Sequence, residues 1–221
     1  IVVYEDNHII VVNKTSSENR SGDKTGDTPL SEMVKQYLKE KYNKPGNVFI
    51  GVTHRLDRPV SGLVVFAKTS KALPRLNEMF RNGEVKKTYW GDSERVPKET
   101  EGELVHYLVR NEKQNKSYAY DKEVKNSKKA VLHYKLIGHS QNYYLLEVDL
   151  KTEGIIRFVA VGQDGMSIKG DLKYGFPRSN PDGSICLHAR TVQFVHPVSK
   201  EMIQLTAPVP EGNLWNGFEM D

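Results

Sequence analysis

The sequence predicts an α+β fold, a single domain built on a mixed, mostly antiparallel sheet flanked by a few helices. Three observations predict it: many short runs rich in β-branched residues, two amphipathic stretches with helical periodicity, and no repeat or long linker. The 221 residues contain 38% hydrophobic and 27% charged side chains, which is ordinary for a folded globular protein. We therefore expect one domain spanning residues 1–221.

Strand signals run along most of the chain. Ile1–Tyr4 and Ile9–Asn13 are short β-branched runs, and the turn-forming residues EDNH between them favour a hairpin. Further strands are expected, several with alternating apolar and polar residues, at Leu63–Ala67, Val85–Trp90, Leu104–Arg110, Val131–Gly138, Tyr143–Asp149, Ile155–Val161, His188–Val195 and Met202–Thr206.

Two segments predict helices. In TPLSEMVKQYLKEKY, Thr28 can cap the helix and Pro29 suits its first position. In SKALPRLNEMFRNG, Ser70 can cap and Gly83 can terminate, provided that Pro74 lies within about the first turn. The first helix has one apolar stripe, formed by Leu30, Met33, Val34, Tyr37 and Leu38.

Composition limits the functional classes. No apolar run approaches the roughly 18 residues that a membrane span needs, and the first residues do not form a signal peptide. Cys186 is the single cysteine, so no internal disulfide is possible, and a small core residue is a more plausible role for it than a nucleophile. We expect a cytoplasmic protein with no membrane association.

The mildly basic charge is unevenly distributed. The net charge is +4, and the segment Asn111–Ala130, NEKQNKSYAYDKEVKNSKKA, carries six lysines against three acids with two tyrosines between them. Such a segment can lie along a phosphate backbone. A solvated hairpin is an equally good interpretation.

One stretch, GVTHRLDRPVSGLVVFAKT from Gly51, places a carboxylate, Asp57, between Arg55 and Arg58 and runs directly into an apolar strand. If this segment is extended, Arg55 and Asp57 face one way and Arg58 the other. An isolated aspartate is already ionised at neutral pH, so the arginines are not needed to ionise it. They can instead orient the carboxylate or engage an anionic substrate such as a phosphodiester. An exposed loop with a weak salt bridge is the alternative.

The string HRLDRPVSGLVVFAKTSKA closely resembles the active-site motif of the RluA-like family of RNA pseudouridine synthases. The resemblance extends over nearly the whole chain, through YEDNHIIVVNK, KKTYW, IKGDLKYG, LHARTVQFVHP and APVPEG. Nothing resembling the S4-type RNA-binding domain of some members precedes it, so we expect the catalytic domain alone. The resemblance implies a pseudouridine-synthase-like fold with a central RNA-binding cleft.

The resemblance also implies the reaction and its residues. A uridine in ribosomal or transfer RNA would be isomerised to pseudouridine, after the target base is flipped out of its stack. Asp57 would be the essential carboxylate, either a nucleophile or a base that removes a sugar proton. Tyr89 would stack on the target base, and Arg157 would pair with Asp57. Substrate contacts are expected from His54, Arg55, Arg58, Lys68 and Lys86. We expect no cofactor, no metal and a monomer.

Three patches depart from the family pattern. TEGIIR, from Thr152 to Arg157, is shorter than the usual T-G-R-x-H-Q-I-R, and the residues that follow it, up to Ser167, also differ. Asn13 begins NKTSSE where N-K-P-x-G is usual, and the polar GDSER follows Trp90 where an apolar strand is expected. These departures leave a second hypothesis open, a catalytically impaired member acting as an RNA-binding module. A third, an unrelated carboxylate hydrolase, lacks a sequence-local partner acid for Asp57.

Overall fold

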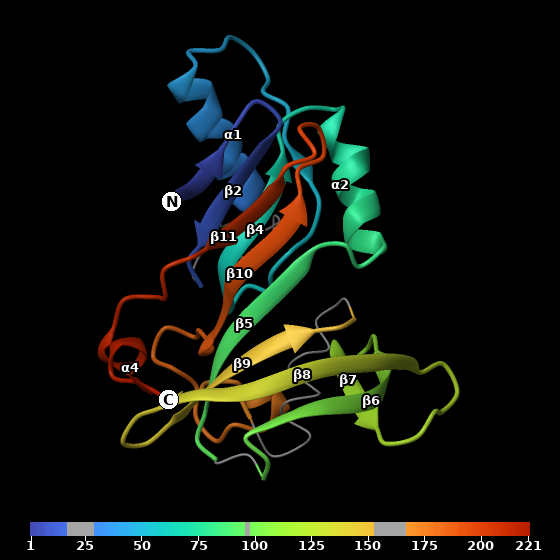
Figure 1. Ribbon diagram of the computed structural model, residues 1–221, viewed down its shortest axis with the longest axis vertical. Helices are drawn as coiled ribbons and strands as arrows, with labels where there is room; N and C mark the ends of the chain where they lie inside the picture. Colours follow the sequence, from blue (N-terminus) through green and yellow to red (C-terminus); the bar gives the residue numbers. More distant parts are fainter. Residues whose placement is uncertain (17–28, 96–97, 153–166) are drawn as a thin grey trace. The chain divides into compact units, whose positions relative to one another are not determined.

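The computed structural model describes residues 1–16, 29–95, 98–152 and 167–221 (Figure 1). The chain divides into two compact units. The first unit comprises Ile1–Val85 and Arg190–Pro208, and the second unit comprises Lys86–Ala189 and Val209–Asp221.

The first unit is built on a sheet whose paired strands run antiparallel wherever their register is defined. β2 lies between β1 and β4, and β4 is also the neighbour of β10. The short β3 pairs with one end of β4, and β11 pairs with β10. The strands are β1 (Val2–Glu5), β2 (Ile9–Lys14), β3 (Gly51–Val52), β4 (Ser61–Ala67), β10 (Leu187–Val195, of which the part from Arg190 belongs to this unit) and β11 (Met202–Thr206).

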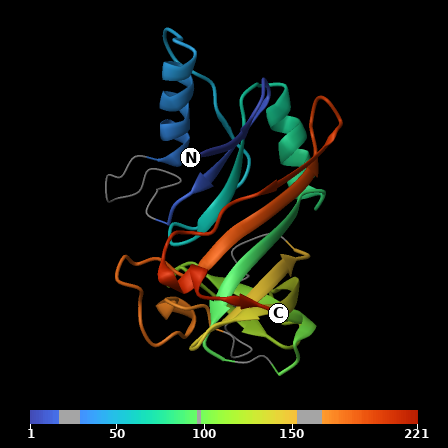
Figure 2. The same ribbon diagram turned by 60° about the vertical axis from the view of Figure 1, so that its left-hand side comes forward.

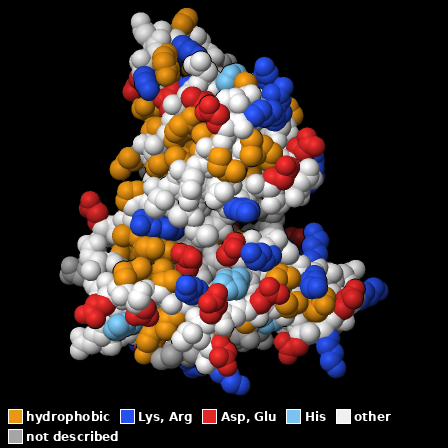
Figure 3. Space-filling view, viewed as in Figure 1, with side chains coloured by type: hydrophobic (Ala, Val, Ile, Leu, Met, Phe, Trp, Pro, Cys, Tyr) orange, Lys and Arg blue, Asp and Glu red, His pale blue; other side chains and the backbone are white. Residues whose placement is uncertain are grey.

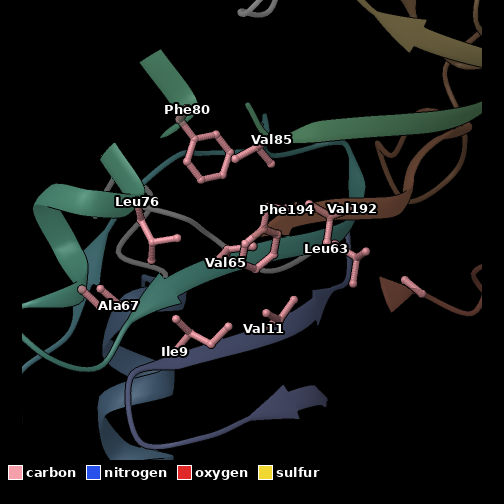
Figure 4. Packing of buried hydrophobic residues seen from close by; sticks show 12 residues of the cluster. Ile9, Val11, Leu63, Val65, Ala67, Leu76, Phe80, Val85, Val192 and Phe194 are labelled. Carbon is pink, nitrogen blue, oxygen red and sulfur yellow. The ribbon is translucent and has the colours of Figure 1, made fainter. Parts of the chain in front are cut away.

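The core of the first unit lies on both faces of β4, whose seven residues are all buried. Because successive side chains of a strand point to opposite faces, a strand that is buried throughout is covered on both sides. On one face, Val65 packs with Leu76 and Phe80 of α2 and with Phe194 of β10 (Figure 4). In Figures 1 and 2 the two helices, α1 and α2, flank these strands.

The helices form close to where they are expected. α1 spans Leu30–Lys41 and buries Leu30, Val34 and Leu38, while Met33 and Tyr37 of the expected stripe are exposed. The expected cap of α1, Thr28, lies outside the described residues. α2 spans Ala72–Arg81, and its first amide is capped by the hydroxyl of Thr69 rather than by the expected Ser70. Gly83 follows α2 with φ at +70°, the left-handed geometry of a helix terminator.

The second unit contains a twisted sheet in the order β5, β9, β8, β6, β7, with every defined register antiparallel. β12 pairs with β8 beside this path. A short 3-10 helix, η1 (Leu172–Tyr174), and the one-turn helix α4 (Asn213–Asn216) lie in the connections. The strands are β5 (Lys86–Ser93), β6 (Glu101–Asn111), β7 (Lys116–Tyr120), β8 (Lys128–His139), β9 (Tyr144–Leu150) and β12 (Glu219–Met220).

The expected α+β class with a mostly antiparallel sheet is confirmed. The sequence analysis missed β7, because the polar segment that contains it has little apolar periodicity. The expected strand Ile155–Val161 lies outside the described residues. Single-domain organisation, the central cleft and the monomeric state stay predictions. Among the described helices, none has the length and apolar character needed to cross a bilayer.

Candidate active site

The loop that carries Asp57 begins where β3 ends. Side chains at the start of this loop keep it attached to β4 through hydrogen bonds. After Val52 the backbone pairing stops, and the Thr53 hydroxyl donates to the carbonyl oxygen of Val65 at 2.6 Å. The amide of Val65 donates to Nε2 of His54 at 2.9 Å. Both backbone groups of Val65 are therefore satisfied by the loop, which fixes the chain leading to Asp57.

His54 is held on the core side of this loop. Its ring stacks on Phe80 with centroids 4.4 Å apart, in addition to accepting from the backbone of β4. An Nε2 that accepts a hydrogen bond is deprotonated, so the ring is neutral in this arrangement. This geometry agrees with a structural histidine, and its expected contact with substrate stays a prediction.

Around Asp57 the exposure alternates as an extended segment requires. Leu56 is fully buried, whereas Arg55 is exposed and Asp57 is half-buried. The segment then turns, with the amide of Val60 donating to the carbonyl oxygen of Asp57 at 2.9 Å. Arg55 and Asp57 consequently share a side of the chain, opposite to the anchoring Leu56.

The turn joins β4 through Gly62, which has φ at +120°. A residue with a Cβ rarely adopts this conformation, so the glycine of the motif is required by the backbone. Gly62 lies opposite Lys14 in the register of β2 and β4.

Lys14 is a buried lysine that the sequence analysis did not select. It is 1% exposed, and its ammonium donates to backbone carbonyl oxygens on the Asp57 loop. The distances from Nζ are 2.7 Å to Val60, 3.0 Å to Arg58 and 3.5 Å to Asp57, with a further contact of 3.0 Å to Thr15. A buried cation on several carbonyl oxygens fastens the turn that follows Asp57. The only signal in the sequence was the NK of NKTSSE, which matches the start of the usual N-K-P-x-G before the segment departs from it at Thr15 and Ser17.

Tyr89 lies in the middle of β5 in the second unit and is fully buried. It is opposite Val148 of β9, which in turn is opposite Tyr134 of β8. Its side chain thus belongs to the inner layer of that sheet. Lys86, at the start of β5, is exposed.

Lys68 is already paired with a carboxylate. Its ammonium lies 2.5 Å from Oε2 of Glu5 and 2.7 Å from the carbonyl oxygen of Asp6. Lys41 and the hydroxyl of Tyr42 also donate to Glu5. Burial raises the pKa of Glu5, but these donors outweigh it and lower the pKa to about 2. A phosphate at Lys68 would have to compete with Glu5.

Arg157 and most of the altered segment Thr152–Ser167 lie outside the described residues, so the expected pairing of Arg157 with Asp57 is untested. Within the residues that the structure describes, no cluster of three or more histidine, cysteine or acidic side chains could hold a metal ion.

The first three residues of the polar GDSER segment, Gly91 to Ser93, are buried at the end of β5. A Cβ on Gly91 would lie 2.8 Å from Cδ1 of Ile168, so the glycine allows close packing there. Asp92 is fully buried, and its carboxyl oxygens have no well-formed hydrogen bond among the described residues, although the weakly donating thiol of Cys186 is a neighbour. Burial raises its pKa well above the ordinary value, although neighbouring Cys186 and Lys169 act against this rise.

Cys186 behaves as a core residue. It is 5% exposed, and burial together with the neighbouring Asp92 raises the pKa of its thiol to about 12. A thiol with that pKa is a poor nucleophile near neutral pH, which agrees with the expected core role.

Comparison with known proteins places this chain in a family. The family described as RNA pseudouridylate synthase matches residues 8–153, which include Asp57 and Tyr89, and the chain belongs to this family. An uncharacterized RNA pseudouridine synthase of Synechocystis is 29% identical over 95% of this chain and 65% of that protein. Ribosomal large subunit pseudouridine synthase D of Zymomonas mobilis is 27% identical over 95% of this chain and 69% of that protein.

Solved structures agree on the fold. Human RNA Pseudouridylate Synthase Domain Containing 4 matches 95% of this chain and 88% of its own, with a TM-score of 0.77 at 20% identity. Family membership, expected from the motifs, is thereby confirmed, as is the class of enzyme that the family comprises. The chain spans about two thirds of the length of these curated relatives.

Proposed function

We propose that this protein isomerises a uridine in RNA to pseudouridine and that Asp57 is its essential carboxylate. The observation that supports this most is the construction of the Asp57 loop. Three side chains, those of Lys14, Thr53 and His54, hold its backbone from both ends, while Asp57 itself is only half-buried. Such a scaffold holds a reacting group in place, and accurate placement is a large part of catalysis.

The reaction needs no external group. The bond between N1 of uracil and C1′ of the ribose breaks, the base turns, and a bond forms between C5 and C1′. The C5 proton is lost to solvent and N1 gains a proton, so atoms and electrons balance without an oxidant or reductant. Asp57 acts either as a nucleophile toward the sugar or base, or as the base that removes a sugar proton.

The target nucleotide must leave its stack before it can reach Asp57, at a cost of a few kcal/mol. Exposed Arg55 and half-buried Arg58 flank the carboxylate and can bind the phosphates that flank an extruded nucleotide. In this proposal Arg157 pairs with Asp57, and Tyr89, which is fully buried in the structure, stacks on the extruded base only after its ring becomes accessible. Lys86, exposed at the start of β5, contacts the backbone, and Lys68 does so only by leaving Glu5.

Ribosomal RNA is the favoured substrate. The named relatives from Zymomonas mobilis and Buchnera aphidicola are ribosomal large subunit pseudouridine synthases D and C. We take transfer RNA as the alternative, and a cytoplasmic location follows from either.

The test is tritium release from RNA labelled at C5 of uracil, because that hydrogen leaves only when the new carbon–carbon bond forms. Asp57→Asn keeps the size of the side chain and removes its charge, and we expect the release rate to fall by roughly 10²–10⁴-fold. Asp221→Asn, at an exposed residue of the second unit, is the matched control and should keep full activity.

Tritium release that survives in Asp57→Asn would refute the role of this carboxylate. If the parent protein releases no tritium from ribosomal or transfer RNA but binds RNA, the alternative of an RNA-binding module replaces the proposed activity.

A further inference from the structure

The outward face of the second unit's sheet carries three tyrosines and two lysines on adjacent strands. Tyr120 of β7 is opposite Tyr107 of β6, which is opposite Lys129 of β8. Directly opposed residues of antiparallel strands point to the same face, so these three form one row across the sheet. Tyr118 and Lys116 follow on the same face of β7 at intervals of two residues. We call these five residues the tyrosine face.

The tyrosine face is accessible to solvent. Tyr118 is 38% exposed and Tyr120 is 45% exposed, whereas the alternate residues of β7 and β6, Ser117 and Leu108, are buried. An open pocket of about 490 Å³ lies against this face, lined by Val109, Tyr118 and Tyr120 together with residues 110–113 at the end of β6 and the start of the following turn. In the space-filling view, hydrophobic side chains in the region of β6 to β8 lie among both basic and acidic side chains (Figure 3).

The sequence segment that carries these rings has a net positive charge, while exposed Glu101 and Glu103 lie farther along the same face of β6. The stretch 107–130 holds seven basic and three acidic residues, so its net charge equals the +4 of the whole chain. Lys116 Nζ lies 5.5 Å from the ring centroid of Tyr118 and 5.6 Å from that of Tyr174. Of the three acids, Glu112 lies 3.9 Å from Arg110, and the other two, Asp121 and Glu123, are exposed in the connection after β7.

Exposed aromatic rings surrounded by lysines fit one kind of partner best. Single-stranded nucleic acid offers flat bases that stack on such rings and phosphates that pair with the cations. An acidic peptide would satisfy the lysines but leave three tyrosine rings without a stacking partner. An apolar protein surface would bury the lysines without a counter-charge.

We propose that the tyrosine face binds a single-stranded segment of the RNA substrate, with bases stacked on Tyr118, Tyr120 and Tyr107 and phosphates held by Lys116 and Lys129. This inference rests on the proposed function in taking RNA as the substrate. It adds a second contact surface, formed by residues outside the family motif, and this surface selects RNA that contains an unpaired segment.

The experiment measures binding of a fluorescent single-stranded RNA of about 12 nucleotides by anisotropy, beside a hairpin of the same composition. We expect Tyr118→Ala with Tyr120→Ala to weaken binding of the single strand about tenfold or more and binding of the hairpin much less. Tyr118→Phe with Tyr120→Phe keeps both rings and should bind within about twofold of the parent. Tyr37→Ala, an exposed tyrosine of α1 with Lys41 at 5.7 Å, is the matched control and should change nothing.

The lysines are tested by salt dependence. Lys116→Gln with Lys129→Gln should reduce the slope of log affinity against log salt by about 1.4, because each phosphate contact on a single strand contributes about 0.7. An unchanged slope would mean that these lysines do not contact phosphates and that the segment is a solvated hairpin.

Several results would overturn the proposal: no binding of the single strand by the parent, equal binding by the alanine variant, or equal loss in the phenylalanine variant. Equal displacement by polyglutamate would assign the face to an acidic peptide instead. Tritium release distinguishes the two proposals. If tritium release is normal but RNA binding does not depend on the tyrosines, only the proposal for the tyrosine face is refuted. If RNA binding depends on the tyrosines but no tritium is released, only the proposed activity is refuted.

Discussion

Lys14 in the first unit and Asp92 in the second are both buried ionisable residues, but their surroundings offer them different hydrogen bonds. Lys14 is 1% exposed and donates to backbone carbonyl oxygens on both sides of the Asp57 turn. Asp92 is 0% exposed, and among the described residues its carboxyl oxygens have no well-formed hydrogen bond, only the weakly donating thiol of Cys186 as a neighbour. The hydrogen bonds of Lys14 therefore organise a loop, whereas burial favours the neutral form of Asp92.

The contrast separates two uses of a buried polar group. A charge that is fully solvated by protein dipoles orients the backbone around it, at a desolvation cost that its hydrogen bonds offset. A carboxyl without such bonds contributes a pH-dependent cost to folding. The first belongs to the proposed active site, and the second lies in a segment where the chain departs from the family pattern.

The largest effect is expected from Lys14→Met, which keeps the length of the side chain and removes its donors. Three carbonyl oxygens of the Asp57 turn then lose their buried partner, and unfolding free energy should fall by about 3 kcal/mol. If Lys14 positions Asp57, kcat for tritium release should fall at least about tenfold in the fraction that stays folded, with KM little changed.

Lys35→Met, on the exposed side of α1, is the control and should alter neither quantity. If the Lys14 variant is destabilised but keeps the kcat of the parent per folded molecule, Lys14 has a structural role only and does not position Asp57.

A smaller effect is expected from Asp92→Asn, and it depends on pH. The folded state raises the pKa of Asp92, so it binds a proton that the unfolded state releases above pH 4. The parent should lose stability as pH rises from about 4 toward the native pKa, and the variant should lack this loss. Chemical denaturation at pH 4 and pH 8 measures it, with the variant more stable than the parent by roughly 1 kcal/mol at pH 8 only.

Equal pH dependence in the parent and in Asp92→Asn would show that Asp92 is solvated after all. Asp221→Asn, an exposed carboxylate, should follow the parent at both pH values.

Glu5 is a carboxylate whose pKa is shifted in the direction opposite to that of Asp92. Donors on Lys41, Lys68 and Tyr42 outweigh burial and hold its pKa at about 2. Its stabilising contribution is therefore present above pH 4.5 and is lost as pH falls toward 2. Glu5→Gln should be less stable than the parent by about 1 kcal/mol at pH 7, with the difference vanishing near pH 2. A difference that persists at pH 2 would assign the effect to packing rather than to charge.

The sequence determined the parts that depend on local pattern. Alternation and β-branched runs located most strands, amphipathic periodicity located α1 and α2, and the HRLD string identified the family, while the role of Asp57 stays a prediction. These succeed because strand and helix periods are properties of neighbouring residues, and because the motif is contiguous. The strand β7 was missed, since its polar residues carry little pattern of their own.

Only the tertiary structure decided which polar side chains lie inside and what they bind. Lys14 reaches carbonyl oxygens more than forty residues away, His54 turns to the backbone of β4, and Asp92 is buried with no well-formed hydrogen bond among the described residues. The tyrosine face likewise exists because three strands pair in one register, which brings Tyr107, Tyr120 and Lys129 into a row. The physical reason is the same in each case: hydrogen bonding and desolvation depend on neighbours in space, and residues distant in sequence supply those neighbours.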